Sequence, residues 1–112
     1  MAKVKIVPSL FQKIQDKFGG ESYKVIDLLE SLEENPKKGK IVGQVSGIVI
    51  KELKYNSFRF YFITDGFKIK VLDLDSLKDL IIKFIRMSDK KSQQKTIDEI
   101  KNILRSLGES GF

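Results

Sequence analysis

Residues 48–64 decide the fold, and they read IVIKELKYNSFRFYFIT. Both halves of this stretch are rich in β-branched and aromatic side chains, which favour strands. Asn56-Ser57 lies between the halves and is typical of a two-residue hairpin turn. Because a tight turn makes two strands antiparallel neighbours, the stretch predicts a β-hairpin of residues 48–55 and 58–64.

The second strand of this hairpin has two different faces, because successive side chains of a strand point to opposite sides of the sheet. Phe58, Phe60 and Phe62 share one face, which we expect to pack against helices. Arg59 and Tyr61 share the other face, which we expect to point toward solvent.

The first strand adds charged groups to that outward face. With Leu53 pointing inward, Glu52 and Lys54 point outward, beside the arginine and the tyrosine of the second strand. A slip of one residue, or a bulge, would place Lys51 there instead.

An arginine, a lysine, a tyrosine and a carboxylate on one exposed sheet face suit phosphoryl chemistry. Arginine binds phosphate through two hydrogen bonds and stabilises developing negative charge. Tyr61 can stack on a base or donate a proton. Glu52, or a lysine whose pKa is lowered by neighbouring cations, can act as a base. The same pattern also fits an ordinary solvated strand face with Glu–Lys and Arg–Tyr pairs across the strands.

The chain before the hairpin predicts one strand and two helices. Residues 2–7 alternate apolar side chains with lysines, as a short strand does. Ser9 is a candidate N-cap for a helix that Gly19-Gly20 stops, and a second helix over residues 21–34 ends before a proline. The short link between the helices predicts an antiparallel pair. Residues 41–45 are expected to be an apolar connector, bulged where it enters the sheet.

The chain after the hairpin predicts a third strand and two more helices. Asp65-Gly66 is a strong hairpin signal, so residues 67–73 should complete a three-stranded antiparallel meander. Apolar residues spaced three and four apart predict a helix over residues 76–86. A capping box that begins at Thr96 opens the last helix, and Gly108 ends it.

The composition fits one α+β domain over residues 1–112 and excludes several kinds of site. Hydrophobic residues make up 41% of the chain, which is ordinary for a globular protein. Cysteine and histidine are absent, which excludes disulfides, thiolate catalysis and cysteine-ligated metals, and no metal or cofactor is expected. We see no signal peptide and no membrane-spanning run, so we expect a cytoplasmic protein.

The net charge of +6 is concentrated in the middle of the chain. Residues 37–70 contain eight basic and two acidic residues, whereas residues 1–36 contain five basic and six acidic ones. A basic segment of this kind suits a polyanion such as RNA or DNA. A solvated surface rich in lysine would give the same excess.

Four stretches, in this order, resemble motifs of the RelE/ParE superfamily of toxins, most closely its HigB-like, phage-derived branch. Residues 32–39, LEENPKKG, resemble the family's L-x-x-N-P-x-x-G. Glu52-Leu53-Lys54 resembles its E-L-R, with lysine in place of arginine, and residues 58–62, FRFYF, are similar to its Y-R-hydrophobic-hydrophobic-Y/F. Residues 90–100, KKSQQKTIDEI, resemble its K-K-S-Q-K-T-P-x-x-E-I. In the family a short link precedes this last motif, whereas here a helix is predicted before it.

The resemblance covers nearly the whole chain and implies a RelE-like fold. That fold has an N-terminal strand, a two-helix hairpin, a three-stranded antiparallel meander and C-terminal helices. The resemblance also implies a ribosome-associated mRNA endonuclease, in which the RNA's own 2′-hydroxyl attacks the adjacent phosphate without a metal. The enzyme then supplies positioning and charge stabilisation more than a nucleophile.

The resemblance implies roles for four residues, and the hairpin pattern adds others. Lys54 and Arg59 match the motif positions that hold the phosphate and its transition-state charge, and Lys90-Lys91 matches the basic run that grips RNA. From the strand pattern, Glu52 and Tyr61 are added as proton carriers or base contacts. The remaining candidates for RNA contact are Lys51 and Arg86, the second of which also fits the wet side of a helix.

Two other functions remain open at this stage. One is a ParE-like toxin that inhibits DNA gyrase by binding, without catalysis, and the other is an inactive relative that only binds RNA. The absence of histidine and of the family's late tyrosine favours these two. Expected partners are a cognate antitoxin, which would form a hetero-oligomer with the chain, and mRNA on the ribosome, but no membrane.

Overall fold

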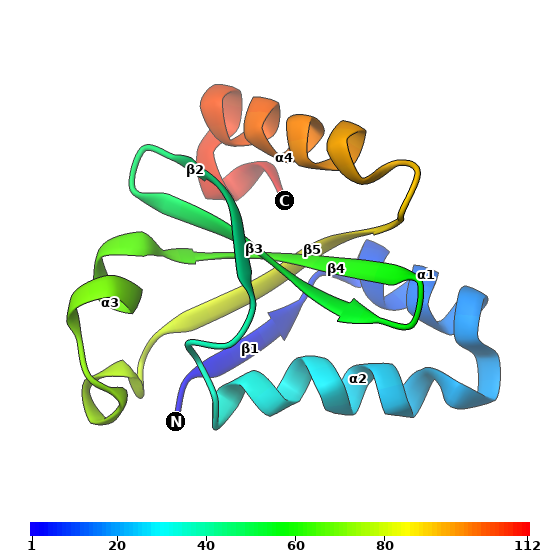
Figure 1. The fold of residues 1–112 in the computed structure, drawn as a ribbon, viewed down its shortest axis with the longest axis horizontal. Coiled ribbons are helices and arrows are strands. Elements are labelled where there is room, and N and C mark those ends of the chain that lie inside the picture. Colours follow the sequence, from blue (N-terminus) through cyan, green and yellow to red (C-terminus); the bar gives the residue numbers. More distant parts are fainter.

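The centre of the protein is a five-stranded mixed sheet, seen in a computed structural model that describes residues 1–112 (Figure 1). Across the sheet the strands lie in the order β1-β5-β4-β3-β2. β1 pairs parallel with β5, and all other neighbours pair antiparallel. The strands span Lys3–Ile6 (β1), Lys40–Val45 (β2), Ile48–Tyr55 (β3), Phe58–Asp65 (β4) and Ile81–Asp89 (β5). The predicted α+β class and the β3–β4 hairpin are confirmed.

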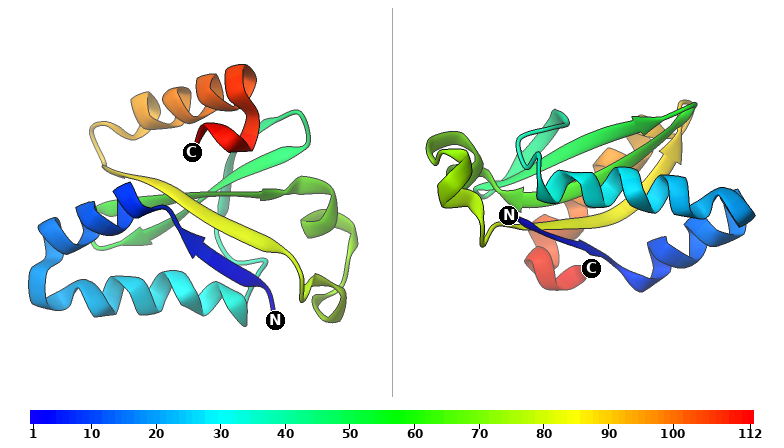
Figure 2. Two further views of the ribbon diagram at one scale, coloured as in Figure 1. Left: turned by 180° about the vertical axis from the view of Figure 1, so that it is seen from behind. Right: turned by 90° about the horizontal axis from the view of Figure 1, so that it is seen from below.

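Helices cover both faces of this sheet. Figures 1 and 2 show α1 and α2 on one side of the strands and α4 on the other. The α-helices span Pro8–Phe18 (α1), Ser22–Glu30 (α2), Gly66–Val71 (α3) and Gln93–Leu107 (α4). Short 3₁₀ turns span Gly19–Glu21 (η1), Ser31–Glu33 (η2), Leu74–Leu77 (η3) and Gly108–Gly111 (η4). None of the helices is both long and apolar enough to cross a membrane.

The first strand, the helical pair after it and the last helix are confirmed, but two helix starts are wrong. α1 begins at Pro8, whose fixed φ suits the first helical position, and Val7 rather than Ser9 is its N-cap. α4 begins at Gln93, so Thr96 lies inside its first turn. The Thr96 hydroxyl donates to the carbonyl of Ser92, four residues back, and caps nothing.

The sheet face that carries Phe58, Phe60 and Phe62, called the phenylalanine face below, packs against the α1–α2 pair as predicted. Phe18 of α1 meets the Phe58 ring edge to face, with the ring centroids 5.4 Å apart. Phe60 and Phe62 are fully buried in the hydrophobic core. The aromatic strand therefore fixes the helical pair to this side of the sheet.

The predicted third strand over residues 67–73 is wrong, because this segment forms the short helix α3. The Asp65 carboxylate accepts a hydrogen bond from the Lys68 amide, so it caps a helix instead of opening a hairpin turn. Phe67 is 70% exposed, although the alternating pattern had placed it on a sheet.

The predicted helix over residues 76–86 is also wrong, because most of it belongs to strand β5. Ile82, Phe84 and Ile85 are all buried, since β5 lies between β1 and β4 with helices on both faces. A strand covered on both faces has a continuous apolar run rather than an alternating one. The run from Leu80 to Ile85 therefore fits a helix and a strand equally well in the sequence.

The segment predicted as a connector, residues 41–45, belongs to strand β2. This strand pairs with β3 and is the third strand of the antiparallel meander, in place of the predicted strand over residues 67–73. Ser46 and Gly47 join it to β3 with φ of 48° and 83°, as a tight two-residue hairpin turn requires. The register shifts between Ile41 and Gly43, which confirms the predicted bulge. The meander thus consists of β2, β3 and β4, with β5 as a fourth antiparallel strand.

Candidate functional site

Polar side chains cross β3, β4 and β5 in two rows on the sheet face opposite the phenylalanines, called the arginine face below. The strand register sets Lys54, Arg59 and Ser88 side by side in one row. The second row consists of Glu52, Tyr61 and Arg86. Residues directly opposite across strands share a face, so the predicted grouping of these β3 and β4 residues is confirmed.

The predicted exposure of this face is wrong, because α4 covers most of it. Tyr61 is 0% exposed, Glu52 is 3% exposed and Arg59 is 8% exposed, whereas Lys54 remains exposed. Gln93 of α4 approaches from above, with its Nε2 atom 3.5 Å from a Glu52 carboxylate oxygen. The pattern of two strands cannot reveal that a helix packs on them, because Gln93 lies 41 residues after Glu52 in the chain.

Arg59 is a buried cation without a carboxylate partner. Its Nη1 atom donates to the Ser57 carbonyl at 3.3 Å, and its buried Nε atom has no hydrogen-bond partner. The ion pairs of the molecule involve only Lys24 and Arg86, so Lys54 stands opposite Arg59 as an uncompensated like charge. Buried cations are normally paired and like charges across strands repel, so this row favours a bound anion.

Ser88 lies at the β5 end of the row that contains Lys54 and Arg59, and Tyr61 of the second row holds it in place. The two hydroxyl oxygens lie 2.8 Å apart in a buried hydrogen bond. Burial is the largest influence on Tyr61 and raises the pKa of its phenol, so the phenol is protonated at neutral pH. Tyr61 therefore orients a serine hydroxyl and does not itself meet a molecule on the surface.

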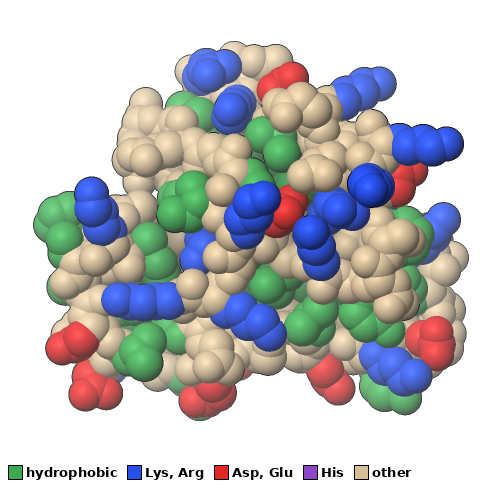
Figure 3. Space-filling model, viewed as in Figure 1, with side chains coloured by type: hydrophobic (Ala, Val, Ile, Leu, Met, Phe, Trp, Pro, Cys, Tyr) green, Lys and Arg blue, Asp and Glu red, His purple; other side chains and the backbone are tan.

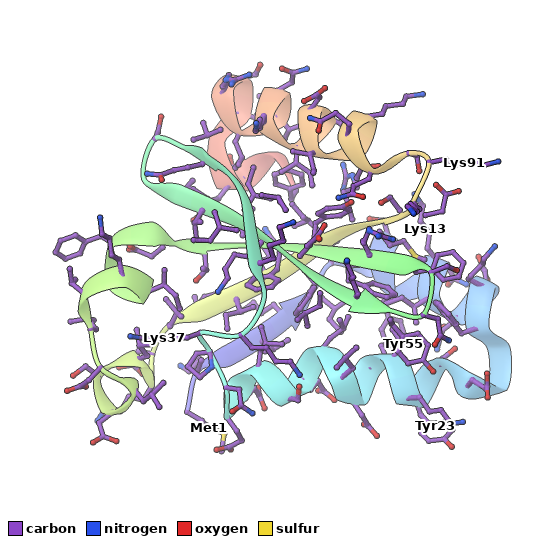
Figure 4. The ribbon with its side chains drawn as sticks, in the orientation of Figure 1. Met1, Lys13, Tyr23, Lys37, Tyr55 and Lys91 are labelled. Carbon is purple, nitrogen blue, oxygen red and sulfur yellow. The ribbon has the colours of Figure 1, made fainter.

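Lys90 and Lys91 lie on the turn between β5 and α4, directly after Asp89. One oxygen of the Asp89 carboxylate accepts hydrogen bonds from the Ser92 amide and hydroxyl, each at 2.8 Å. These bonds lower the pKa of Asp89 and fix the shape of the turn. Both lysines are exposed, and Figure 4 shows Lys91 pointing away from the fold. This turn, called the basic turn below for Lys90 and Lys91, therefore lies at the end of the arginine face.

Arg86 lies on the arginine face, but its guanidinium is already engaged. Its Nε atom lies 2.9 Å from a Glu99 oxygen, its Nη1 atom donates to the Ile85 carbonyl, and its guanidinium lies 5.1 Å from the Phe112 ring centroid. These contacts tie β5 to α4 and to the C-terminal turn. We therefore leave Arg86 out of the site, contrary to its prediction as an RNA contact.

Lys51 lies on the phenylalanine face, so the alternative register that would have placed it beside Arg59 is wrong. It is buried, and its Nζ atom donates to the Lys37 carbonyl at 2.9 Å. Burial lowers the pKa of Lys51. Lys51 therefore anchors the basic loop of residues 37–40 and is not available to a ligand.

Basic and acidic side chains occupy different parts of the molecular surface. Figure 3 shows lysine and arginine side chains gathered over the middle and right of the face in view, with most acidic ones along its lower edge. Figure 1 shows α2 along that lower edge. The basic middle, over the strands and the turn before α4, is the part of this face that suits a polyanion.

Sequence reasoning missed two polar groups of the site, Ser88 and Gln93. Ser88 would follow from the alternation of β5 once residues 81–89 are taken as a strand, and Gln93 belongs to the KKSQ stretch. No cluster of three or more acidic side chains has the geometry of a metal site. Comparisons with protein-family models, with curated proteins and with solved structures found no match to this chain.

Proposed function

We propose that this protein is the toxin of a type II toxin–antitoxin system and acts as a ribosome-associated mRNA endonuclease. The observation that carries the proposal is the row of Lys54 and Arg59: two adjacent cations, one of them buried, with no carboxylate bonded to either. A phosphate of RNA supplies the missing negative charge. Arg59 can bind it through the guanidinium N–H groups that the Ser57 carbonyl leaves free, apart from the buried Nε.

The order of the elements supports the same proposal. Apart from the short helix α3 and the turn η3 between β4 and β5, the chain has a strand, a helical pair, antiparallel strands and a last helix, in the order expected of a RelE-like toxin. The helix that the sequence had suggested before the KKSQ stretch is replaced by β5, which leads directly into Lys90. This removes one of the differences between the chain and the family pattern.

In the proposed reaction, the RNA 2′-oxygen forms a bond to the adjacent phosphorus while the bond to the 5′-oxygen breaks. Arg59 holds the phosphate and stabilises the extra charge of the five-coordinate transition state. The 2′-hydroxyl proton passes to water, and the exposed Lys54 ammonium protonates the leaving 5′-oxygen. Glu52 and Tyr61 act as positioning residues, since they are buried and hold Gln93 and Ser88.

Cleavage of mRNA in a translating extract tests this proposal. The wild-type protein should cut ribosome-bound mRNA and leave 2′,3′-cyclic phosphate ends, and a 2′-deoxy nucleotide at the cut site should block cutting. Arg59→Met should reduce the cutting rate by at least about 100-fold, as loss of a main charge-stabilising group does. Arg105→Met is the matched control, because Arg105 is an exposed arginine near the end of α4. Intact mRNA with the wild-type protein would refute the endonuclease.

A relative that binds RNA without cutting it is the second candidate. The burial of Glu52 and Tyr61 favours it, because no accessible carboxylate or phenol remains on the arginine face for proton transfer. In this case the extract would show wild-type protein bound to RNA that stays intact. A ParE-like toxin would instead stall replication on induction and leave ribosomal mRNA uncut.

The proposed partner that silences the toxin is an antitoxin with an acidic or amphipathic segment. Such a segment would cover the basic turn and Lys54, and salt should slow its association because the encounter is electrostatically steered. Induction of the protein with and without a neighbouring antitoxin gene would show whether growth arrest depends on the uncovered basic face.

A further inference from the structure

A groove of about 410 Å³ lies between α1 and the free end of β5. β1 pairs with β5 only along residues 81–84, so the last residues of β5 have no strand on that side. Lys13, Asp16 and Lys17 of α1 form one wall, because residues three and four apart share one face of a helix. The end of β5 forms the opposite wall.

The groove lies around the free edge of β5, where the phenylalanine face and the arginine face meet. Ser88 lines the groove and is also the neighbour of Arg59 across the strands. Figure 4 shows Lys13 and Lys91 at the same end of the molecule, one from α1 and the other from the turn before α4. A chain-like ligand bound at Arg59 therefore enters the groove at Ser88.

The lining of the groove suits a base flanked by phosphates better than a phosphate alone. Phe58 and Met87 give it an apolar floor, and the Lys17 ammonium lies over the Phe58 ring, 5.1 Å from its centroid, so a base that packs on this ring displaces the ammonium toward the rim. The carboxylates of Asp16 and Asp89 would repel a phosphate in the middle and can accept N–H bonds from a base. The two lysines of α1 remain for phosphates at the rim.

We propose that this groove binds one nucleotide of a single-stranded RNA, next to the phosphate held by Arg59. The base packs on Phe58 and Met87, and Lys13 and Lys17 contact the flanking phosphates. This proposal rests on the proposed function, since it extends the same RNA beyond the site at Arg59.

The test measures binding of a short single-stranded RNA across a range of salt concentrations. Lys13→Gln/Lys17→Gln should weaken binding about tenfold at low salt and reduce the salt slope by about 1.4, because each phosphate contact to a single strand contributes roughly 0.7. Lys3→Gln/Lys24→Gln is the matched control, since it removes the same charge from exposed positions on β1 and α2. Glutamine is a good helix former, so α1 should stay intact.

An abasic scan of the same RNA tests the base contact without any protein variant. Removing one base while keeping its phosphates should weaken binding about tenfold at a single position, because the stacking of that base on an aromatic side chain is lost.

Two results separate this inference from the proposed function. Suppose that the RNA binds, that Arg59→Met weakens binding, but that both double variants bind alike and every abasic RNA binds normally. The proposal that the groove binds a nucleotide is then refuted, and the proposed function is retained. If the wild-type protein does not bind RNA at all, the proposed function fails and the inference fails with it.

Discussion

Arg59 is a largely buried residue opposite Lys54, and its buried Nε atom has no hydrogen-bond partner. A buried unsatisfied donor lowers stability by about 1–3 kcal/mol, and the neighbouring like charge adds to this cost. Arg59→Met should therefore raise the free energy of unfolding by roughly 1 kcal/mol, measured by urea denaturation, while it abolishes RNA binding at this row. Arg105→Met should leave both unchanged. A clear loss of stability in Arg59→Met would mean that Arg59 has a structural partner.

Lys51 makes stability depend on pH, because burial lowers its pKa from the ordinary value of 10.5. Between the lowered pKa and 10.5, the unfolded chain holds a proton that the folded protein has released. The free energy of unfolding therefore rises with pH in this window, and below it the buried charge reduces stability. The stability of Lys51→Met relative to wild type should be highest near neutral pH and should fall as the pH rises through this window to 10.5.

Urea denaturation at a series of pH values measures this difference, and the exposed Lys40→Met serves as the control. Other lysines and the tyrosines titrate in the same range, so the quantity to follow is the difference between variant and wild type. An equal pH profile in Lys51→Met and wild type would show that Lys51 is solvated in the native protein.

At the scale of elements, the helix α3 depends on the Asp65 cap. Its sequence, GFKIKV, alternates as a strand does and has weak helix formers (Gly, Phe, Ile and Val) at every position except its two lysines. The Asp65 carboxylate accepts a hydrogen bond from the Lys68 amide at 3.0 Å. Asp65→Ala should lower the free energy of unfolding by about 1 kcal/mol, as loss of an N-cap does, whereas Asp65→Asn should retain most of it. Asp79→Ala removes an exposed carboxylate outside the helices as a control. Equal stability of Asp65→Ala and Asp65→Asn would exclude a capping role.

The sequence predicted the elements that local signals determine and failed where distant packing decides. The β3–β4 hairpin follows from two dense strands around Asn56-Ser57, and its faces follow from alternation. The run at residues 80–85 becomes a strand only because β1 and β4 pair with it from both sides, and those pairings join segments far apart in the chain. Asp65-Gly66 has two valid uses, a turn and a helix cap, and the sequence does not distinguish them.

The sequence predicted which residues of β3 and β4 lie together in the candidate site, but it did not predict how deeply they are buried. Alternation correctly grouped Glu52, Lys54, Arg59 and Tyr61 on one face. Their burial depends on where α4 docks, which no local pattern specifies, and so the expected open surface became a narrow site with one exposed lysine.

At the scale of the whole molecule, the salt dependence of RNA binding should depend less on the net charge of +6 than on the positions of the individual cations. If RNA phosphates meet the four cations at the arginine face and the basic turn, the logarithm of the binding constant should fall with the logarithm of salt concentration with a slope of roughly −2.8. If the two lysines of the groove also contact phosphates, the slope should be about −4.2. These cations are Lys54, Arg59, Lys90 and Lys91, joined in the second case by Lys13 and Lys17.

A variant of equal net charge separates local contacts from a diffuse attraction. Lys24→Gln/Arg105→Gln lowers the charge to +4, as Lys90→Gln/Lys91→Gln does, but its positions lie on α2 and near the end of α4. Only the second pair should reduce the salt slope, because counterions are released where cations touch phosphates. If both pairs reduce the slope equally, the protein attracts RNA through its overall field. The arginine face would then have no special part in binding.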